Sequence, residues 1–179
     1  TPEQVRQFQL YYEELVEWNQ RVNLTAITGY EEVQVRHFLD SLTVIPALED
    51  VSWAEQDFAM IDVGTGGGVP GIPLKIVLSQ ARAVLLDSVA KKTAFVRHAV
   101  QSLGLQDTEV VTGRAEALAH EAVYRQTFDL AVCRAVSSLA TIAELTLPFL
   151  RNGGLAVIFK KGAIEEELTR ATKAIGVLG

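Results

Sequence analysis

A short apolar stretch, residues 58–63, leads directly into a turn in which five of the eight residues 64–71 are glycine. Glycine has no Cβ, so it lets the backbone adopt positive φ and approach a ligand closely. A helix that begins after such a turn directs its free N–H groups at that ligand. The segment therefore predicts a strand, a nucleotide-binding turn and a helix in succession.

From residue 58 onwards the sequence predicts alternating strands and helices. We expect strands near 58–63, 83–87, 108–112, 128–133 and 155–159, and helices near 71–79, 90–103, 138–147 and 163–175. The run 83–87 is apolar until its final acid, Asp87, which is typical of a strand covered on both faces. This alternation predicts an α/β fold with a doubly wound, mostly parallel, Rossmann-like sheet. Such sheets usually have one or two further strands, so we expect the C-terminal strands to be absent from this sequence.

The first 50 residues predict a helical N-terminal cap. Apolar residues at three- and four-residue steps predict a helix over 2–22 and a second over 30–45, begun by a capping box at 28–31 and ended near Pro46. The second helix is expected to bury Val35, Phe38, Leu39, Leu42 and Ile45, and to group Arg36, His37, Asp40 and Ser41 on its other side. We divide the chain into a helical extension, 1–50, and a nucleotide-binding domain, 51–179, with 49–57 as the hinge.

Composition excludes several classes of protein. The net charge of −6 argues against a chain coated in positive charge, although it allows a local basic groove. The single cysteine, Cys133, and three scattered histidines predict neither a disulfide framework nor a metal site. No apolar stretch approaches 18 residues and no signal peptide opens the sequence, so we expect a cytoplasmic protein with no membrane contact and a monomer by default.

The glycine pattern is compatible with more than one nucleotide ligand, and the first to consider is NAD. Residues 66–71 satisfy G-x-G-x-x-G, and Asp87 follows about 20 residues later, as in NAD-linked oxidoreductases. Against that reading, Asp62 lies two residues before the first glycine, where a dinucleotide fold needs apolar packing. Pro70 and Pro73 also flank the last glycine, where that fold needs an uninterrupted helix start. A non-catalytic nucleotide-sensing module would have the same turn and is a third reading.

The pattern D-x-G-x-G-x-G over 62–68, with a second acid at the end of the next strand, is typical of class I methyltransferases that use S-adenosylmethionine. That cofactor carries no phosphate, so the turn needs no lysine or arginine. Asp62 would face its amino group, directly or through water, and Asp87 would take the two ribose hydroxyls. The backbone of Gly64, Thr65, Gly66 and Gly68 would pass under the sulfonium and the ribose.

The chain resembles the ribosomal RNA small-subunit methyltransferase G family, also called glucose-inhibited division protein B. The matching segments run in order along nearly the whole chain: 18–19, 22–27, 36–42, 62–74, 86–88, 91–92 with Phe95, 113–116, 134–135 and 160–162. The resemblance implies methylation of N7 of one guanosine in 16S ribosomal RNA, free or in the small subunit, with S-adenosylmethionine as cofactor. It also implies cofactor contacts at Gly64, Val69, Ala115 and Glu116, and a site role for Arg134.

Methylation of guanine N7 needs no general base, because N7 has an exposed lone pair and no proton to lose. Catalysis then depends mostly on positioning, and a carboxylate would stabilise the cationic product. Our hypothesis places Asp40 as that charge partner, with His37 and Arg36 in the guanine pocket and Arg134 gripping phosphate or base. RNA also needs positive charge. The candidates are Arg36 in the cap, Lys91 and Lys92 on the helix over 90–103, and Lys160 and Lys161, which follow a strand at the ligand edge of the sheet.

Overall fold

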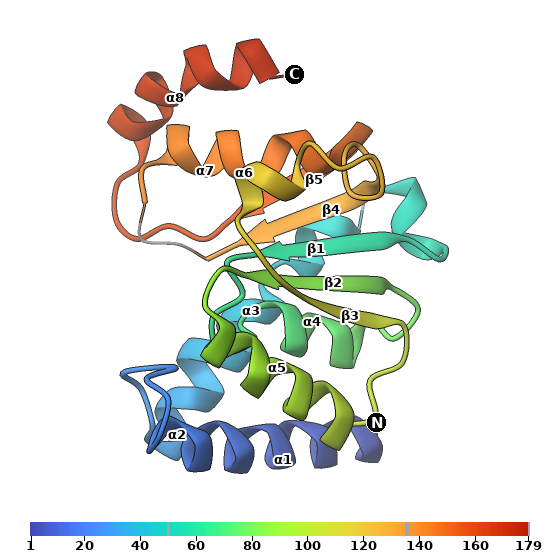
Figure 1. Ribbon diagram of the computed structural model, residues 1–179, viewed down its shortest axis with the longest axis vertical. Coiled ribbons are helices and arrows are strands. Elements are labelled where there is room, and N and C mark those ends of the chain that lie inside the picture. The colour runs from blue at the N-terminus through green and yellow to red at the C-terminus, as the bar shows by residue number, and fades with distance from the viewer. Residues whose placement is uncertain (50, 135–136, 179) are drawn as a thin grey trace.

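The structure is a computed structural model that describes residues 1–49, 51–134 and 137–178. Five parallel strands form one sheet in the order β3-β2-β1-β4-β5 (Figure 1). Their bounds are β1 Ala59–Val63, β2 Arg82–Asp87, β3 Thr108–Thr112, β4 Phe128–Cys133 and β5 Leu150–Ile158. This confirms the predicted Rossmann-like sheet. The strand order reverses between β1 and β4, which is where such sheets bind their ligands, beyond the carboxyl ends of the strands.

Helices cover both faces of the sheet, because alternate residues of each strand point to opposite sides. On one face, Ile61 and Val84 pack with α6 Ala115–Leu118 and with Phe149, and α7 Leu139–Thr146 and α8 Glu165–Leu178 lie beyond (Figure 1). On the other face, Leu85 packs against α4 Gly71–Val77 and α5 Ala90–Ser102. The short helix α6 was not predicted, and β5 begins five residues earlier than expected.

The first helix, α1 Pro2–Asn19, forms an additional layer against α4 and α5 (Figure 1). A capping box joins Thr1 and Gln4 at its start. The helix ends three residues earlier than predicted because the Asn19 side chain accepts hydrogen bonds from the backbone N–H groups of Leu24 and Thr25. These bonds turn the chain back along the helix.

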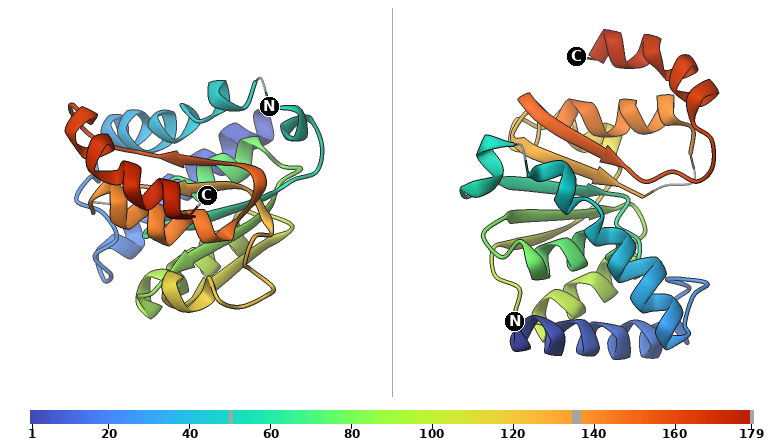
Figure 2. Two further views of the ribbon diagram at one scale, coloured as in Figure 1. Left: turned by 90° about the horizontal axis from the view of Figure 1, so that it is seen from above. Right: turned by 180° about the vertical axis from the view of Figure 1, so that it is seen from behind.

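The second helical segment contains a π-helix that the sequence pattern did not reveal. It consists of α2 Tyr30–Val33, the π-helix η1 Gln34–Leu39, α3 Asp40–Leu42 and the 3-10 turn η2 Ile45–Leu48, and it runs from α1 to the sheet (Figure 2). A π-helix has more residues per turn than an α-helix, so the assumed 100° step places the side chains wrongly. The predicted burial of Val35 and Leu39 is therefore wrong, since they are 56% and 60% exposed.

The same shift in register buries two residues that the α-helical pattern grouped on the polar side. His37 and Ser41 are buried, and the Ser41 hydroxyl donates to the His37 carbonyl at 2.5 Å. The predicted capping box is also wrong, because Gly29 is the N-cap residue and makes no side-chain cap. Within the predicted hinge, residue 50 lies outside the described residues and η3 Ser52–Glu55 follows it. The division at residue 50 stays a prediction.

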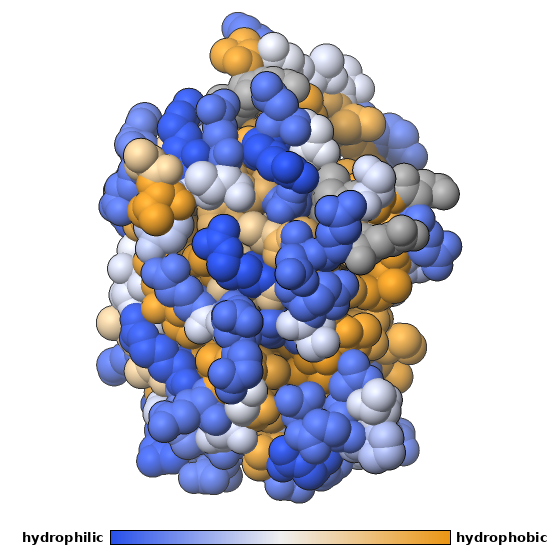
Figure 3. Space-filling view, turned by 90° about the vertical axis from the view of Figure 1, so that its right-hand side faces the viewer, coloured by the Kyte–Doolittle hydropathy of each residue, from blue (hydrophilic) through white to orange (hydrophobic). Residues whose placement is uncertain are grey.

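A hydrogen bond and an ion pair stabilise the edge of the sheet at which the strands begin. Asp129 of β4 accepts a hydrogen bond from the Ala59 N–H at 2.7 Å and pairs with Arg151 of β5. Figure 3 shows this side of the molecule, where hydrophilic residues cover much of the surface and apolar residues are visible between them. The glycines and acids of the sequence motif gather at the opposite edge.

Candidate functional site

The glycine turn is attached to the end of the neighbouring strand. The backbone N–H groups of Gly64 and Thr65 both donate to the Leu86 carbonyl, at 2.8 and 2.9 Å. Gly64, Gly66 and Gly68 have φ of 79°, 58° and 90°, a region that residues with a Cβ rarely adopt. The conformation of the turn therefore depends on glycine at these three positions.

The turn has an open side and a packed side. A Cβ built on Gly64 would meet nothing within 4 Å, and one on Gly66 would meet only the Gly64 carbonyl oxygen at 3.9 Å. A Cβ on Gly68 would lie 2.5 Å from Ile72 Cδ1, and one on Gly71 would lie 2.7 Å from Asp62 Oδ2. Gly64 and Gly66 thus leave space for a ligand, whereas Gly68 and Gly71 allow close packing behind the turn.

Asp62 is a buried carboxylate with one unpartnered oxygen. Only 1% of the residue is exposed, and its Oδ2 accepts hydrogen bonds from the Thr65 hydroxyl at 2.7 Å and the Gly71 N–H at 2.8 Å. Its Oδ1 is buried with no hydrogen-bond partner in the described structure. Burial, with a smaller contribution from the neighbouring Asp87, raises the pKa of this carboxyl to about 7 against the lowering effect of the Thr65 and Gly71 hydrogen bonds. A buried acceptor that lacks a donor suits a ligand with an ammonium group.

The raised pKa of Asp62 predicts how stability depends on pH. Between about pH 4 and 7 the folded protein keeps a proton on Asp62 that the unfolded chain has lost, so the free energy of unfolding should fall as pH rises through this window. The contribution of this one group is at most about 1.4 kcal/mol per pH unit. Urea unfolding of the parent and of Asp62→Asn across the window measures it. A decline of equal slope in both proteins would contradict the assignment.

Asp87 connects the turn to the next helix. Its Oδ2 accepts the Gly66 N–H at 2.9 Å and its Oδ1 accepts the Val89 N–H at 2.8 Å, just before α5. A carboxylate accepts about four hydrogen bonds, so two positions remain for a ligand's hydroxyl groups. Thr65 is buried with its hydroxyl on Asp62, and Val69 is partly buried just before α4.

The end of β3 lies at the same edge of the sheet. The Gly113 N–H donates to the Asp87 carbonyl at 3.1 Å, and α6 begins two residues later with Ala115. Glu116 is exposed and pairs with Arg114 at 2.9 Å, and the pKa of its carboxyl is lowered by a backbone hydrogen bond and by that arginine. The structure thus brings the predicted positions after β1, β2 and β3 to one edge.

Arg134 directly follows β4 and is held by the cap segment. Its Nη2 donates to the Arg36 carbonyl at 2.6 Å and lies 3.2 Å from Asp40 Oδ2. Asp40 and His37, which our hypothesis places in the same pocket as Arg134, are therefore its neighbours in the structure, and its Nη1 is 3.5 Å from His37 Nδ1. Ala135, which the resemblance also includes, lies outside the described residues.

His37 is enclosed and not free to act on a ligand in this structure. Its Nε2 lies 2.8 Å from the Thr25 hydroxyl and its Nδ1 lies 3.1 Å from the Arg36 carbonyl. These partners assign a neutral ring that donates from Nδ1 and accepts at Nε2. Burial lowers the pKa of this histidine, which agrees with a neutral ring. His37 thus joins the 19–25 turn to the segment that holds Arg134.

The predicted RNA-binding cations differ in how exposed they are and in whether they are paired. Lys91 and Lys161 are exposed, Lys92 is partly exposed, and Arg36 is exposed but pairs with Glu32 at 3.1 Å. The Lys160 side chain is only 16% exposed, because its Nζ donates to the Ser137 carbonyl and to Glu167 Oε1, both at 2.8 Å. Lys160 therefore helps to attach α8 to the sheet.

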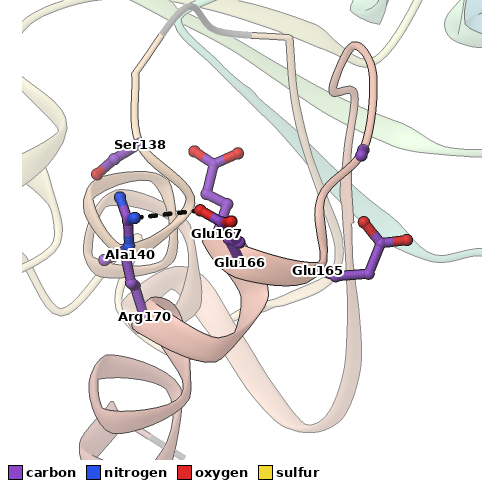
Figure 4. Close-up of a pocket in the computed structure, with 7 residues that line it drawn as sticks. Ser138, Ala140, Glu165, Glu166, Glu167 and Arg170 are labelled. Carbon is purple, nitrogen blue, oxygen red and sulfur yellow. Dashed lines mark hydrogen bonds and ion pairs between the residues drawn. The ribbon is translucent and has the colours of Figure 1, made fainter.

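A cavity of about 680 Å³ lies beside this lysine, between the starts of α7 and α8 (Figure 4). Its lining includes Ser138, three consecutive glutamates at 165–167 and Arg170, which pairs with Glu166 at 3.3 Å. Glu167 also accepts the Leu139 N–H at 2.8 Å, so it caps α7. The acidic lining does not suit a phosphate group, and this hollow is separate from the glycine turn.

Comparison with known proteins now identifies the family. The family described as "GidB: rRNA small subunit methyltransferase G" matches residues 4–179. The chain belongs to this family. It is 44% identical over 176 residues to a ribosomal RNA small subunit methyltransferase G of Dehalococcoides mccartyi, covering 98% of this chain and 73% of that protein. The protein of the same name from Alkaliphilus metalliredigens is 45% identical, with 98% and 72% covered.

Solved structures with the same fold are more distant. A SAM-dependent methyltransferase from Aquifex aeolicus matches with a TM-score of 0.54 at 17% identity, covering 82% of each chain. Precorrin-6y C5,15-methyltransferase from Geobacter metallireducens matches with a TM-score of 0.53 at 17% identity, covering 69% of this chain and 64% of that one. At this identity the likeness shows the fold alone, so this member of the methyltransferase G family shares the sheet architecture of these enzymes.

Within residues 1–49, 51–134 and 137–178, no helix is long and apolar enough to span a membrane. The same residues contain no group of three or more His, Cys, Asp or Glu placed to hold a metal ion.

Proposed function

We propose that this chain transfers a methyl group from S-adenosylmethionine to N7 of a guanine in 16S ribosomal RNA. The observation that carries the proposal is the unpartnered Asp62 Oδ1 beside the open side of the glycine turn, in a member of the methyltransferase G family. An oxygen in that state needs a donor, and the amino group of the cofactor is such a donor. A nicotinamide dinucleotide offers a pyrophosphate instead, which a buried carboxylate repels.

The residues at the carboxyl edge of the sheet fit the cofactor. Asp62 would hold its amino group, the backbone of Gly64 and Gly66 would lie under its centre, and Asp87 would accept from its ribose hydroxyls. Ala115 and Glu116 would lie on the adenine side. When bound, S-adenosylmethionine supplies a methyl group on a positively charged sulfur.

The protein's contribution to the reaction is positioning and charge stabilisation. Guanine N7 has a lone pair and no proton to lose, so no residue must act as a base. Asp40 is 44% exposed at its side chain and would stabilise the positive charge that develops on the methylated guanine. Arg134, held by the Arg36 carbonyl and Asp40, would orient the base or its phosphate. His37 would support this arrangement indirectly, because its hydrogen bonds fix the backbone of the cap segment.

The positive residues at the site edge would contact the RNA backbone, and they predict a salt effect. Lys91→Ala with Lys92→Ala should weaken RNA binding and reduce the slope of log affinity against log salt by about 1.4–1.8, since each of the two lost phosphate contacts contributes about 0.7–0.9. S-adenosylhomocysteine affinity should stay unchanged. Binding measured across a salt series tests this. Lys173→Ala is the matched control, because that exposed lysine lies on α8. An unchanged slope in the double variant would contradict an RNA contact at Lys91 and Lys92.

Methyl transfer tests the proposed function directly. Labelled methyl groups from S-adenosylmethionine should enter small-subunit RNA, and strand cleavage specific for N7-methylguanine should locate them at one guanine. Parallel reactions with assembled small subunits and with naked 16S RNA distinguish the two substrates. Binding of the cofactor without any transfer would favour a sensing module, and calorimetric binding of NAD in place of S-adenosylhomocysteine would favour an oxidoreductase. A ribosomal RNA substrate supports our further proposals that the enzyme acts in the cytoplasm and that it is a monomer.

A further inference from the structure

The N-terminal helix reaches the back of the glycine turn. The Tyr11 hydroxyl of α1 donates a hydrogen bond of 2.6 Å to the Gly67 carbonyl, and the whole residue is buried. We propose that Tyr11 is a positioning residue for the cofactor, which holds the turn in the conformation that exposes Gly64 and Gly66. This inference rests on the proposed function, because Tyr11 would affect the cofactor only through the glycine turn that binds it.

The turn needs such a support because its middle is three successive glycines. Gly66 and Gly68 flank Gly67 with positive φ, and glycine reaches many other conformations at little cost. The Gly66 N–H is fixed by Asp87 and the Gly68 N–H by the Thr65 carbonyl. The Gly67 carbonyl points the other way, into the protein, where it meets Tyr11. A rotation of the Gly67–Gly68 peptide would break this bond and change the open side of the turn.

Tyr11 is itself rigidly held. Its ring stacks on Phe38 of the π-helix, with centroids 5.2 Å apart and an angle of 20° between the rings. Leu15 lies one turn along α1 and faces the same glycine, since a Cβ on Gly67 would be 3.3 Å from Leu15 Cδ1. Burial raises the pKa of the Tyr11 hydroxyl well above its usual value, so the hydroxyl keeps the proton that it donates. The cap thus presents a fixed donor to a flexible turn.

Tyr11→Phe removes this donor and keeps the ring. Its affinity for S-adenosylhomocysteine, measured by calorimetry, should fall about three- to tenfold, since a typical hydrogen bond contributes about 0.5–1.5 kcal/mol. The KM for S-adenosylmethionine should rise by the same factor while kcat and the KM for RNA stay unchanged, which is the pattern of lost binding without lost chemistry.

Tyr12→Phe is the matched control. It removes a hydroxyl from the neighbouring residue of α1, which donates to the Thr28 carbonyl at 3.3 Å and does not touch the turn. Parent-like S-adenosylhomocysteine affinity in Tyr11→Phe, or an equal loss in both variants, would overturn the inference. If Tyr11→Phe does not fold, Leu15→Val loosens the same support, and parent-like affinity there would overturn it too. Failure of the parent to bind S-adenosylhomocysteine would instead contradict the proposed function.

Discussion

Asp62→Asn should weaken S-adenosylhomocysteine binding about ten- to hundredfold, because a hydrogen bond to a charged group contributes about 1.5–3 kcal/mol. The substitution keeps the size of the side chain and an oxygen that accepts from the Gly71 N–H. It replaces the unpartnered oxygen with an amide N–H₂, which repels the ammonium group of the ligand. Calorimetric titration of both proteins at pH 8 measures the difference, since Asp62 is ionised there.

Asp129→Asn is the control for this experiment. Asp129 is also a buried acid on a central strand, but it lies at the edge where the strands begin and pairs with Arg151. Its replacement should lower stability and leave S-adenosylhomocysteine affinity unchanged. If Asp62→Asn binds as tightly as the parent, Asp62 does not hold the amino group and the proposed cofactor orientation is wrong.

Gly71→Ala should lower the free energy of unfolding by about 2–3 kcal/mol, because extra atoms in a well-packed core typically cost about 1–3 kcal/mol. The added Cβ would lie 2.7 Å from Asp62 Oδ2 and also against the Leu85 side chain. Neither Asp62 nor Leu85 has free space to move into, since both are buried where β1, β2 and α4 pack together. Urea unfolding followed by circular dichroism measures the loss, and cofactor affinity should fall with it because Asp62 must move.

Gly104→Ala separates this steric effect from the general cost of replacing glycine. Gly104 has φ of 64° and follows α5, and a Cβ there would meet nothing within 4 Å. Its replacement should cost about 1–2 kcal/mol through backbone strain alone and leave the cofactor site unaffected. A Gly71→Ala protein as stable as the parent would show that α4 is not packed as closely behind the turn as described.

The sheet was predictable because its signals are local. The strands β1, β2 and β4 are short, mostly apolar runs, and α5 ends within a residue of its predicted end because Gly104 takes positive φ there. The glycine turn was predictable for the same reason, since closely spaced glycines directly indicate a turn that needs positive φ. The short helix α6 was missed because four residues are too few to show helical periodicity.

The cap and its contacts were not predictable from local patterns. The π-helix adds a residue to one turn and has no recognisable sequence pattern, so the α-helical periodicity assigns Val35 and Leu39 to the wrong face. The role of Tyr11 depends on a carbonyl 56 residues away. The sequence predicts an RNA contact at Lys160, and only the fold shows that Glu167 pairs with it. Such partners are brought together by the tertiary structure, so the spacing of residues along the sequence does not reveal them.

A crystal structure with S-adenosylhomocysteine would show whether Asp62 and Asp87 hold the cofactor. We expect the ligand's amino group within hydrogen-bonding reach of Asp62 Oδ1, directly or through one water, and its ribose hydroxyls on Asp87. Ligand density away from the glycine turn, or a ligand in the turn that leaves both carboxylates without contact, would contradict it.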